Sequence, residues 1–186
     1  MTTSPRHLLT VWNPSYTGDV LDVHLSVLLD WARRVDAGRA DRDEIYVWWA
    51  KIRSKNRDGR LPHHAEVLAL DEQARAGTET HLYLTDYRSL YVAEIGEITD
   101  EDVRAEAGEV EHMPAYYKDY AIDFWFRLFD MRRLITGDTL EVIEELKKLK
   151  NTGYHDRPVS LYGGIVDLPL IVYRDPSVEW FADTAG

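Results

Sequence analysis

The chain has 186 residues and a mass of 21.6 kDa, so residues 1–186 are expected to form one domain with one hydrophobic core. Hydrophobic residues make up 45% and charged residues 30% of the sequence, which excludes a disordered chain, and no apolar run could span a bilayer, so we expect a cytoplasmic protein. The net charge of −11 opposes nonspecific binding to nucleic acid, and the absence of cysteine excludes disulfide scaffolds, thiol nucleophiles and zinc fingers.

The first half of the chain is predicted to contain a strand, a helix and a hairpin. Residues 6–12 are a short β-rich run that ends at Asn13-Pro14, which is typical of a strand entering a turn. Apolar residues at three- and four-residue steps, followed by a glycine, predict a helix over 19–36. Residues 44–53 alternate between two faces and predict a strand, and residues 63–70 are interpreted as its returning partner across an Asp-Gly turn.

The second half of the chain is predicted to add three strands, a helix and a last strand. Residues 80–98 indicate two strands around a turn, and residues 121–133 indicate one strand with a core face. A capping-box-like start, an apolar stripe and trailing lysines predict a helix over 139–150. The run LPLIVY predicts a last strand, and residues 175–186 are expected to form a flexible tail. This pattern favours an α+β fold with a curved, mostly antiparallel, barrel-like sheet flanked by helices.

Charge is distributed unevenly along the chain. Residues 51–60 carry a formal charge of +4, and residues 94–111 carry a formal charge of −7. The basic segment is expected at a hairpin tip, where its side chains would be placed to contact phosphates. The predicted phosphate-binding residues are Lys51, Arg53, Lys55, Arg57 and Arg60.

Motifs of nucleotide-dependent enzymes and hydrolases are absent from the sequence, which contains no GxxxxGK[ST], GxGxxG or GxSxG pattern. His63 and His64 could in principle ligate a metal, but neighbours in a strand point to opposite faces, and no second ligand motif accompanies them. Asp86, Asp123 and Asp130 are the strand-associated acids that an enzyme could use, yet none has an evident catalytic partner. No catalytic residue, metal or cofactor is therefore predicted.

Aromatic residues are frequent, with six tryptophans and eleven tyrosines, and several stand where a strand meets a turn. Most single aromatics are expected to be core residues, but a group converging at one mouth of a curved sheet would form a stacking slot for a planar group. Trp48 and Trp49 occupy opposite faces of their strand, so only one of them can face such a slot. The predicted pocket residues are Trp12, Asn13, Trp48, Trp49, Tyr83, Tyr116, Tyr117 and Asp130.

These features together resemble the PUA-like superfamily, in particular its EVE and YTH branches, which bind modified bases. The resemblance rests on a first strand that ends in Val11-Trp12-Asn13-Pro14, a following helix, and the aromatic strand Tyr46–Lys51 that runs into the basic loop. A later aromatic strand, Phe124–Leu128, is again followed by a helix, and the matching part covers about residues 6–150. The resemblance implies a small β-barrel that holds a flipped base in an aromatic pocket and catalyses no reaction.

The resemblance also implies DNA or RNA, modified or unmodified, as the partner. Domains of this kind often accompany a nuclease or motor module in defence systems, so a fused or associated effector domain is expected as a further partner. The residues leave a second function open, a protein-interaction or regulatory domain that uses the acidic segment 94–111 to meet a basic partner. A base-binding domain requires the cations and the aromatic slot on one face, whereas an interaction domain requires an exposed apolar patch.

Overall fold

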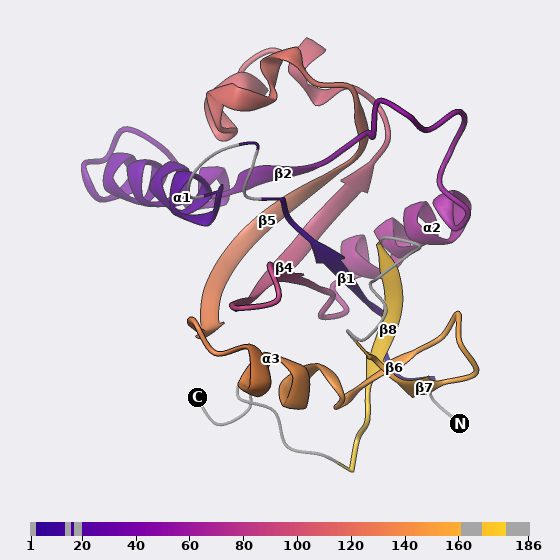
Figure 1. Cartoon of the computed structure of the whole chain (residues 1–186). Helices are drawn as coiled ribbons and strands as arrows, with labels where there is room; N and C mark the ends of the chain where they lie inside the picture. The colour runs from indigo at the N-terminus through magenta and orange to yellow at the C-terminus, as the bar shows by residue number, and fades with distance from the viewer. Residues whose placement is uncertain (1–2, 14–15, 17–19, 161–168, 178–186) are drawn as a thin grey trace.

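The computed structural model describes residues 3–13, 16, 20–160 and 169–177. This part of the chain contains three α-helices and eight strands, and Figure 1 shows how they are arranged. The helices are α1 (Val20–Asp36), α2 (His64–Arg75) and α3 (Thr139–Leu146). The strands are β1 (His7–Val11), β2 (Val47–Ile52), β3 (His81–Thr85), β4 (Leu90–Thr99), β5 (Ile122–Ile135), β6 (Leu149–Asn151), β7 (Arg157–Pro158) and β8 (Leu170–Arg174). Short 3₁₀ helices are η1 (Arg42–Glu44), η2 (Val103–Ala105), η3 (Glu109–His112) and η4 (Ala115–Asp119).

The described strands form one mixed sheet in the order β2-β5-β4-β3-β1-β8-β6-β7. Neighbouring strands in the described sheet are antiparallel except β1 and β3, which run parallel with Leu8 opposite Leu82. A parallel pair requires a long crossover, and here the connection from β1 to β3 contains α1, β2 and α2. The fold is therefore α+β with a mostly antiparallel sheet, as the alternating sequence pattern predicted.

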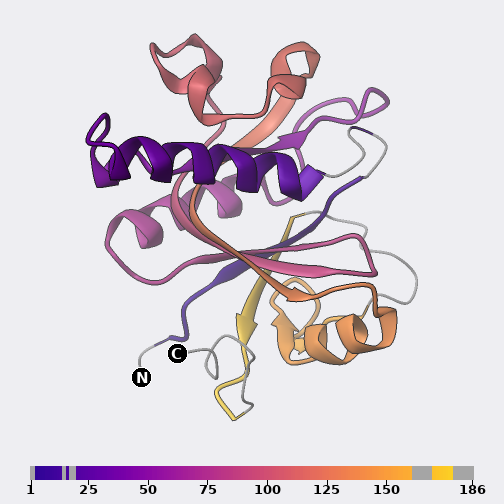
Figure 2. The same ribbon diagram turned by 90° about the vertical axis from the view of Figure 1, so that its left-hand side faces the viewer.

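The main hydrophobic core lies between one face of strands β1–β5 and the helices α1 and α2. Leu8, Trp49 and Phe126 are buried in it, and Val67 and Leu70 reach it from α2. Leu25, Val27 and Leu28 pack against it from α1. In Figure 1, α1 lies to the left of β1 and β4, and α2 lies to their right. Figure 2 shows α1 running across the front of the molecule.

The opposite face of the sheet is covered by two smaller clusters. Val142 and Leu146 of α3 pack on Leu9, Tyr83 and Val172, so α3 covers the end of the sheet formed by β1, β3 and β8. The second cluster lies over β2 and β5, where 3₁₀ segments between β4 and β5 supply the cover. Its buried members are Tyr46, Trp48, Ala50, Val103, Met113, Tyr117 and Trp125. Strand β2 is therefore buried on both faces, which explains its near-continuous run of large side chains.

One predicted element was wrong, and a second was predicted too long. Residues 63–70 were expected to be a strand that closes a hairpin with β2, but they begin helix α2, which buries His64, Val67 and Leu70 at three-residue spacing. The basic segment 51–60 is therefore a β2–α2 loop rather than a hairpin tip. The helix expected over 139–150 ends at Leu146, because Leu149 already pairs with Arg174 of β8.

The other predicted elements are confirmed with small shifts of their bounds. The strand expected over 6–12 is β1, the helix over 19–36 is α1, and residues 80–98 contain β3 and β4. Residues 170–173 of the LPLIVY run lie in β8, and Leu168 lies outside the described residues. Most of the tail expected over 175–186, namely residues 178–186, lies outside the described residues. Within the part of the chain that is described, no helix is both long enough and apolar enough to cross a bilayer.

Candidate functional site

A cavity of about 240 Å³ lies where the C-terminal ends of β1 and β2 meet η4. We call this cavity the aromatic pocket. Its lining residues are Val11, Trp12, Asn13, Tyr16, Trp49, Ala50, Lys51, Ile52, Ser54 and Tyr116. Strands β1 and β2 are separated by β5, β4 and β3 in the sheet, yet residues at the C-terminal ends of both strands line this cavity.

The two tryptophans of the aromatic pocket are held rigidly by the sheet. The Trp12 backbone N–H donates to the Thr85 carbonyl at 3.2 Å, and the Trp12 ring packs edge-to-face on Tyr91 with centroids 5.4 Å apart. Trp49 packs on Phe126 of the neighbouring strand at 5.9 Å. The indole N–H of Trp49 is buried and has no hydrogen-bond partner among the described residues. Such an unpaired buried donor is rare in proteins.

Two tyrosines form the opposite wall of the aromatic pocket. Tyr116 stands on η4 beside Tyr117, with ring centroids 4.2 Å apart, and Tyr16 packs edge-to-face on Tyr120 at 5.1 Å. Burial raises the pKa of Tyr116, so its phenol stays neutral at physiological pH. The Tyr117 hydroxyl fixes η4 in place, because it accepts the Ala50 N–H at 3.0 Å.

Lys51 supplies a positive charge at the pocket. It stands on β2 two residues after Trp49 and is half-buried. Burial lowers the pKa of Lys51, the nearby Asp123 carboxylate raises it, and the Arg57 guanidinium lowers it. A partly desolvated ammonium of this kind gains more from an anionic partner than a fully hydrated surface lysine does.

The other predicted phosphate-binding residues are mostly engaged within the protein. Arg57 forms an ion pair with Asp123, whose side chain is 4% exposed. Arg53 donates to the Gly59 carbonyl at 2.6 Å, which folds the loop back on itself. Arg60 lies 3.9 Å from the carboxylate of Asp100. Of the five cations, Lys55 is the one that is exposed and makes no ion pair or hydrogen bond with any described residue.

Comparison with known proteins gives no relative for this site. No protein-family model, no curated protein and no solved structure matches the chain. Its interpretation therefore depends on its own geometry.

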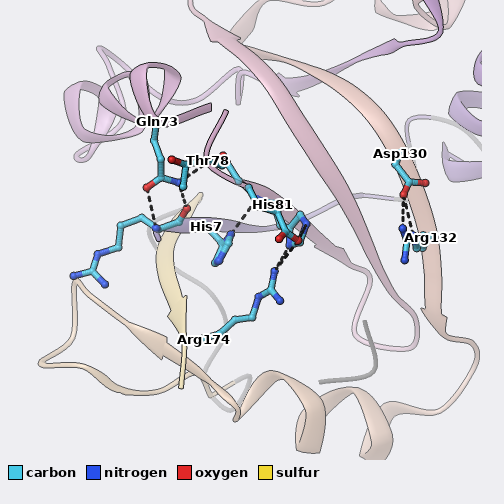
Figure 3. Close-up of polar contacts among 10 residues, drawn as sticks. His7, Gln73, Thr78, His81, Asp130, Arg132 and Arg174 are labelled. Carbon is cyan, nitrogen blue, oxygen red and sulfur yellow. Dashed lines mark hydrogen bonds and ion pairs between the residues drawn. The ribbon is translucent and has the colours of Figure 1, made fainter. Parts of the chain in front are cut away.

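Four residues predicted for the pocket lie elsewhere. Trp48 faces the opposite side of β2 and donates its indole N–H to Glu109 at 2.6 Å. Tyr117 is fully buried behind Tyr116, and Tyr83 belongs to the cluster under α3. Asp130 lies on β5, where it pairs with Arg132 at 2.8 Å (Figure 3), and both residues line a second cavity together with His81.

The acids considered for catalysis have structural partners. Asp86 accepts the backbone N–H groups of Arg88 and Ser89 and so caps the β3–β4 turn. Asp123 pairs with Arg57, and its second carboxylate oxygen is buried without a hydrogen-bond partner in the described chain. Within the described residues, no three histidine or carboxylate side chains are grouped to hold a metal ion.

The structure adds residues that the sequence reasoning missed. Tyr16 and Ser54 line the aromatic pocket, as do the backbone-proximal residues Val11, Ala50 and Ile52. Tyr16 follows the end of β1, as Trp12 and Asn13 do, and Ser54 follows the end of β2. The sequence analysis expected residues at strand ends to meet at one pocket, and applying this expectation to Tyr16 and Ser54 would have found them. The pocket thus combines four aromatic rings with a lysine and small polar groups.

Proposed function

We propose that the protein binds nucleic acid by holding one base in the aromatic pocket, in the manner of the PUA-like base-binding domains that its sequence resembles. The observation that carries this proposal is the convergence of Trp12, Trp49, Tyr16 and Tyr116 on one cavity beside Lys51. Aromatic rings stack on the faces of any base, and a cation at the mouth attracts the attached phosphate. An enzymatic role has no comparable support among the described residues.

The size of the pocket favours a single planar group. Its volume of about 240 Å³ is below the range of about 300–1,000 Å³ that is usual for drug-sized ligands, so it suits one ring system rather than a larger molecule. Residues at the ends of β1 and β2 line one cavity although three strands separate β1 from β2 in the sheet, which supports a curved, barrel-like sheet and the PUA-like interpretation of the fold. A base could enter only when unpaired or flipped from its helix, because stacked bases hide their faces.

The test is a binding titration of the parent protein with short single-stranded oligonucleotides that carry unmodified or methylated bases. Trp12 and Trp49 are only 8% and 4% exposed, so truncating either would cost about 3–5 kcal/mol of stability and confound the result. Tyr16 and Tyr116 are half-buried and give cleaner variants. Loss of one stacking ring, as in Tyr16→Leu, should weaken binding by roughly ten- to a hundredfold.

The matched control is Tyr154→Leu, which removes a tyrosine that is 57% exposed and lies outside the pocket. This variant should bind like the parent, and thermal melting should show that both variants keep the fold. If no oligonucleotide binds the parent, or if Tyr16→Leu and Tyr154→Leu bind equally well, the pocket does not hold a base. An interaction domain that uses the acidic segment 94–111 would then be the better interpretation.

A further inference from the structure

We infer that the aromatic pocket recognises a single nucleotide through its base and one or two phosphates, and that the protein does not follow a nucleic-acid backbone. This inference rests on the proposed base-binding function and names its ligand class, one nucleotide unit with the one or two phosphates attached to its sugar. Such a unit can be a free nucleotide or one unpaired residue of a strand. The structural basis is the small number of cations that remain available around the pocket.

In segment 51–60, the three arginines each contact another group of the protein itself. Arg57 is paired with the buried Asp123, and Arg60 lies 3.9 Å from Asp100. Asp123 offsets one of these charges inside the fold, whereas Asp100 faces Arg60 at the surface, where the Arg60 side chain is 75% exposed. Arg53 keeps its charge, but its guanidinium donates at 2.6 Å to the Gly59 carbonyl inside the loop.

The loop is also fixed in this arrangement. Asp100 accepts a second contact from His64 at the start of α2, at 2.7 Å, so the carboxylate that faces Arg60 is tied to the fold. Moving Arg57 to a phosphate would break the ion pair of the buried Asp123 carboxylate and leave it only the nearby Lys51 ammonium, which is unfavourable. The loop therefore presents Lys51 at the pocket and Lys55 on the surface as its two available ammonium groups.

The net charge of the rest of the molecule does not favour binding of an extended nucleic-acid strand. The protein carries a net charge of −11, of which segment 94–111 contributes −7 before its pairs with Arg34, Arg60 and Arg75 are counted. A polyanion that extends beyond the pocket would be repelled by the net negative charge of the protein. A single nucleotide at Lys51 and Lys55 would be repelled less, because it carries far fewer charges.

The number of phosphate contacts can be measured from the dependence of affinity on salt. For single strands the logarithm of the affinity falls with the logarithm of salt with a slope of about −0.7 per phosphate contacted. Two contacts predict about a sevenfold loss of affinity between about 50 and 200 mM salt, whereas five contacts predict about a 130-fold loss. The two cases are separated by more than a factor of ten.

The experiment compares, by quenching of intrinsic tryptophan fluorescence, a nucleoside 5′-monophosphate with the oligonucleotide that carries the same base. The base is the one that binds best in the oligonucleotide titration, and both ligands are measured at the two salt concentrations. Lys55→Glu should weaken both ligands by a similar, small factor. Arg39→Glu makes the same charge change and serves as the control. Arg39 follows the C-terminal end of α1, a helix about 25 Å long, whereas Tyr16 precedes its N-terminal end.

Affinities for the two ligands within about threefold of each other at the lower salt concentration, with a salt effect of about sevenfold on the oligonucleotide, are the expected result. An oligonucleotide that binds tenfold or more tightly than its nucleotide, with a salt effect near a hundredfold, would overturn this inference and leave the proposed base-binding function standing. Absence of binding by both ligands would instead refute the proposed function, so the two failures are distinguishable.

Discussion

Mild acid should destabilise the fold, because two buried histidines on β1 and β3 are held neutral. The rings of His7 and His81 stack with centroids 5.3 Å apart, and the His81 backbone N–H donates to His7 Nδ1 at 3.0 Å. Arg174 donates to His81 Nδ1, so the proton of His81 is on Nε2, which lies 2.8 Å from Glu79 (Figure 3). Burial and then the charge of Arg174 lower the pKa of His7 to about 3 and that of His81 to about 4.

The size of the effect follows from the difference between folded and unfolded pKa values. An unfolded histidine has a pKa of about 6.5, so below this pH the unfolded chain binds protons that the folded chain refuses. Stability is complete above about pH 6.5 and falls as the pH drops toward the folded pKa values. At about pH 5 each histidine costs about 2 kcal/mol, and the pair costs about 4 kcal/mol of the 5–15 kcal/mol that is usual for a domain. Burial also lowers the pKa of His112, which adds to the loss.

The assay is urea unfolding between about pH 8 and pH 5, with the free energy of unfolding extrapolated to water. In His7→Asn the side-chain amide oxygen can replace the Nδ1 acceptor but does not titrate, so this variant should lose about 2 kcal/mol of the pH dependence. His155→Asn is the control, because His155 is exposed and has a φ of 52°, which asparagine tolerates. A free energy constant within about 1 kcal/mol over this range, or an unchanged dependence in His7→Asn, would refute the reasoning.

Two further predictions concern packing and charge. In Gly96→Ala the new Cβ would lie 1.9 Å from the Phe129 ring, so the ring must move, and melting should show a loss of about 1–3 kcal/mol that Phe129→Leu partly restores. Arg57→Ala should cost about 3–5 kcal/mol because it removes the ion-pair partner of the buried Asp123 carboxylate. The double variant Arg57→Met with Asp123→Leu should recover most of this loss in the same urea assay, and equal losses in the two variants would show that the ion pair itself stabilises the loop.

The fold could be predicted from the sequence where periodicity and turn signals agreed. Strands β2 and β5 and helix α1 have long patterns of one clear period, and they were found with nearly correct bounds. Helix α2 was missed because a run of eight residues that mixes apolar and polar side chains fits either period. Reading on to Arg75 would have favoured a helix, since this stretch is rich in alanine, leucine and glutamate. The parallel pairing of β1 with β3 joins residues more than 70 positions apart, which no local pattern specifies.

The pocket was predictable only in part. Trp12, Asn13, Trp49 and Tyr116 meet in the structure because strand ends gather at one side of a bent sheet. Alternation could not decide between Trp48 and Trp49, because both faces of β2 are buried. Asp123 pairs with Arg57 and Asp100 lies near Arg60, and both acids are more than 35 residues away in the sequence. The charge of segment 51–60 read from the sequence alone therefore exceeds the charge that is left unpaired in the structure.

The place of β1 in the sheet has a consequence for how the chain acquires its structure. The first strand lies between β3 and β8, and β8 is also the strand that joins β6 and β7 to the rest of the sheet. During synthesis about 160 further residues must be added after β1 before β8, its second neighbour, emerges. Until then the backbone N–H and C=O groups on that edge of β1 have no strand partner. So many contacts between distant residues predict slow folding for a domain of this size, with the final step being the arrival of β8 at the edge of β1.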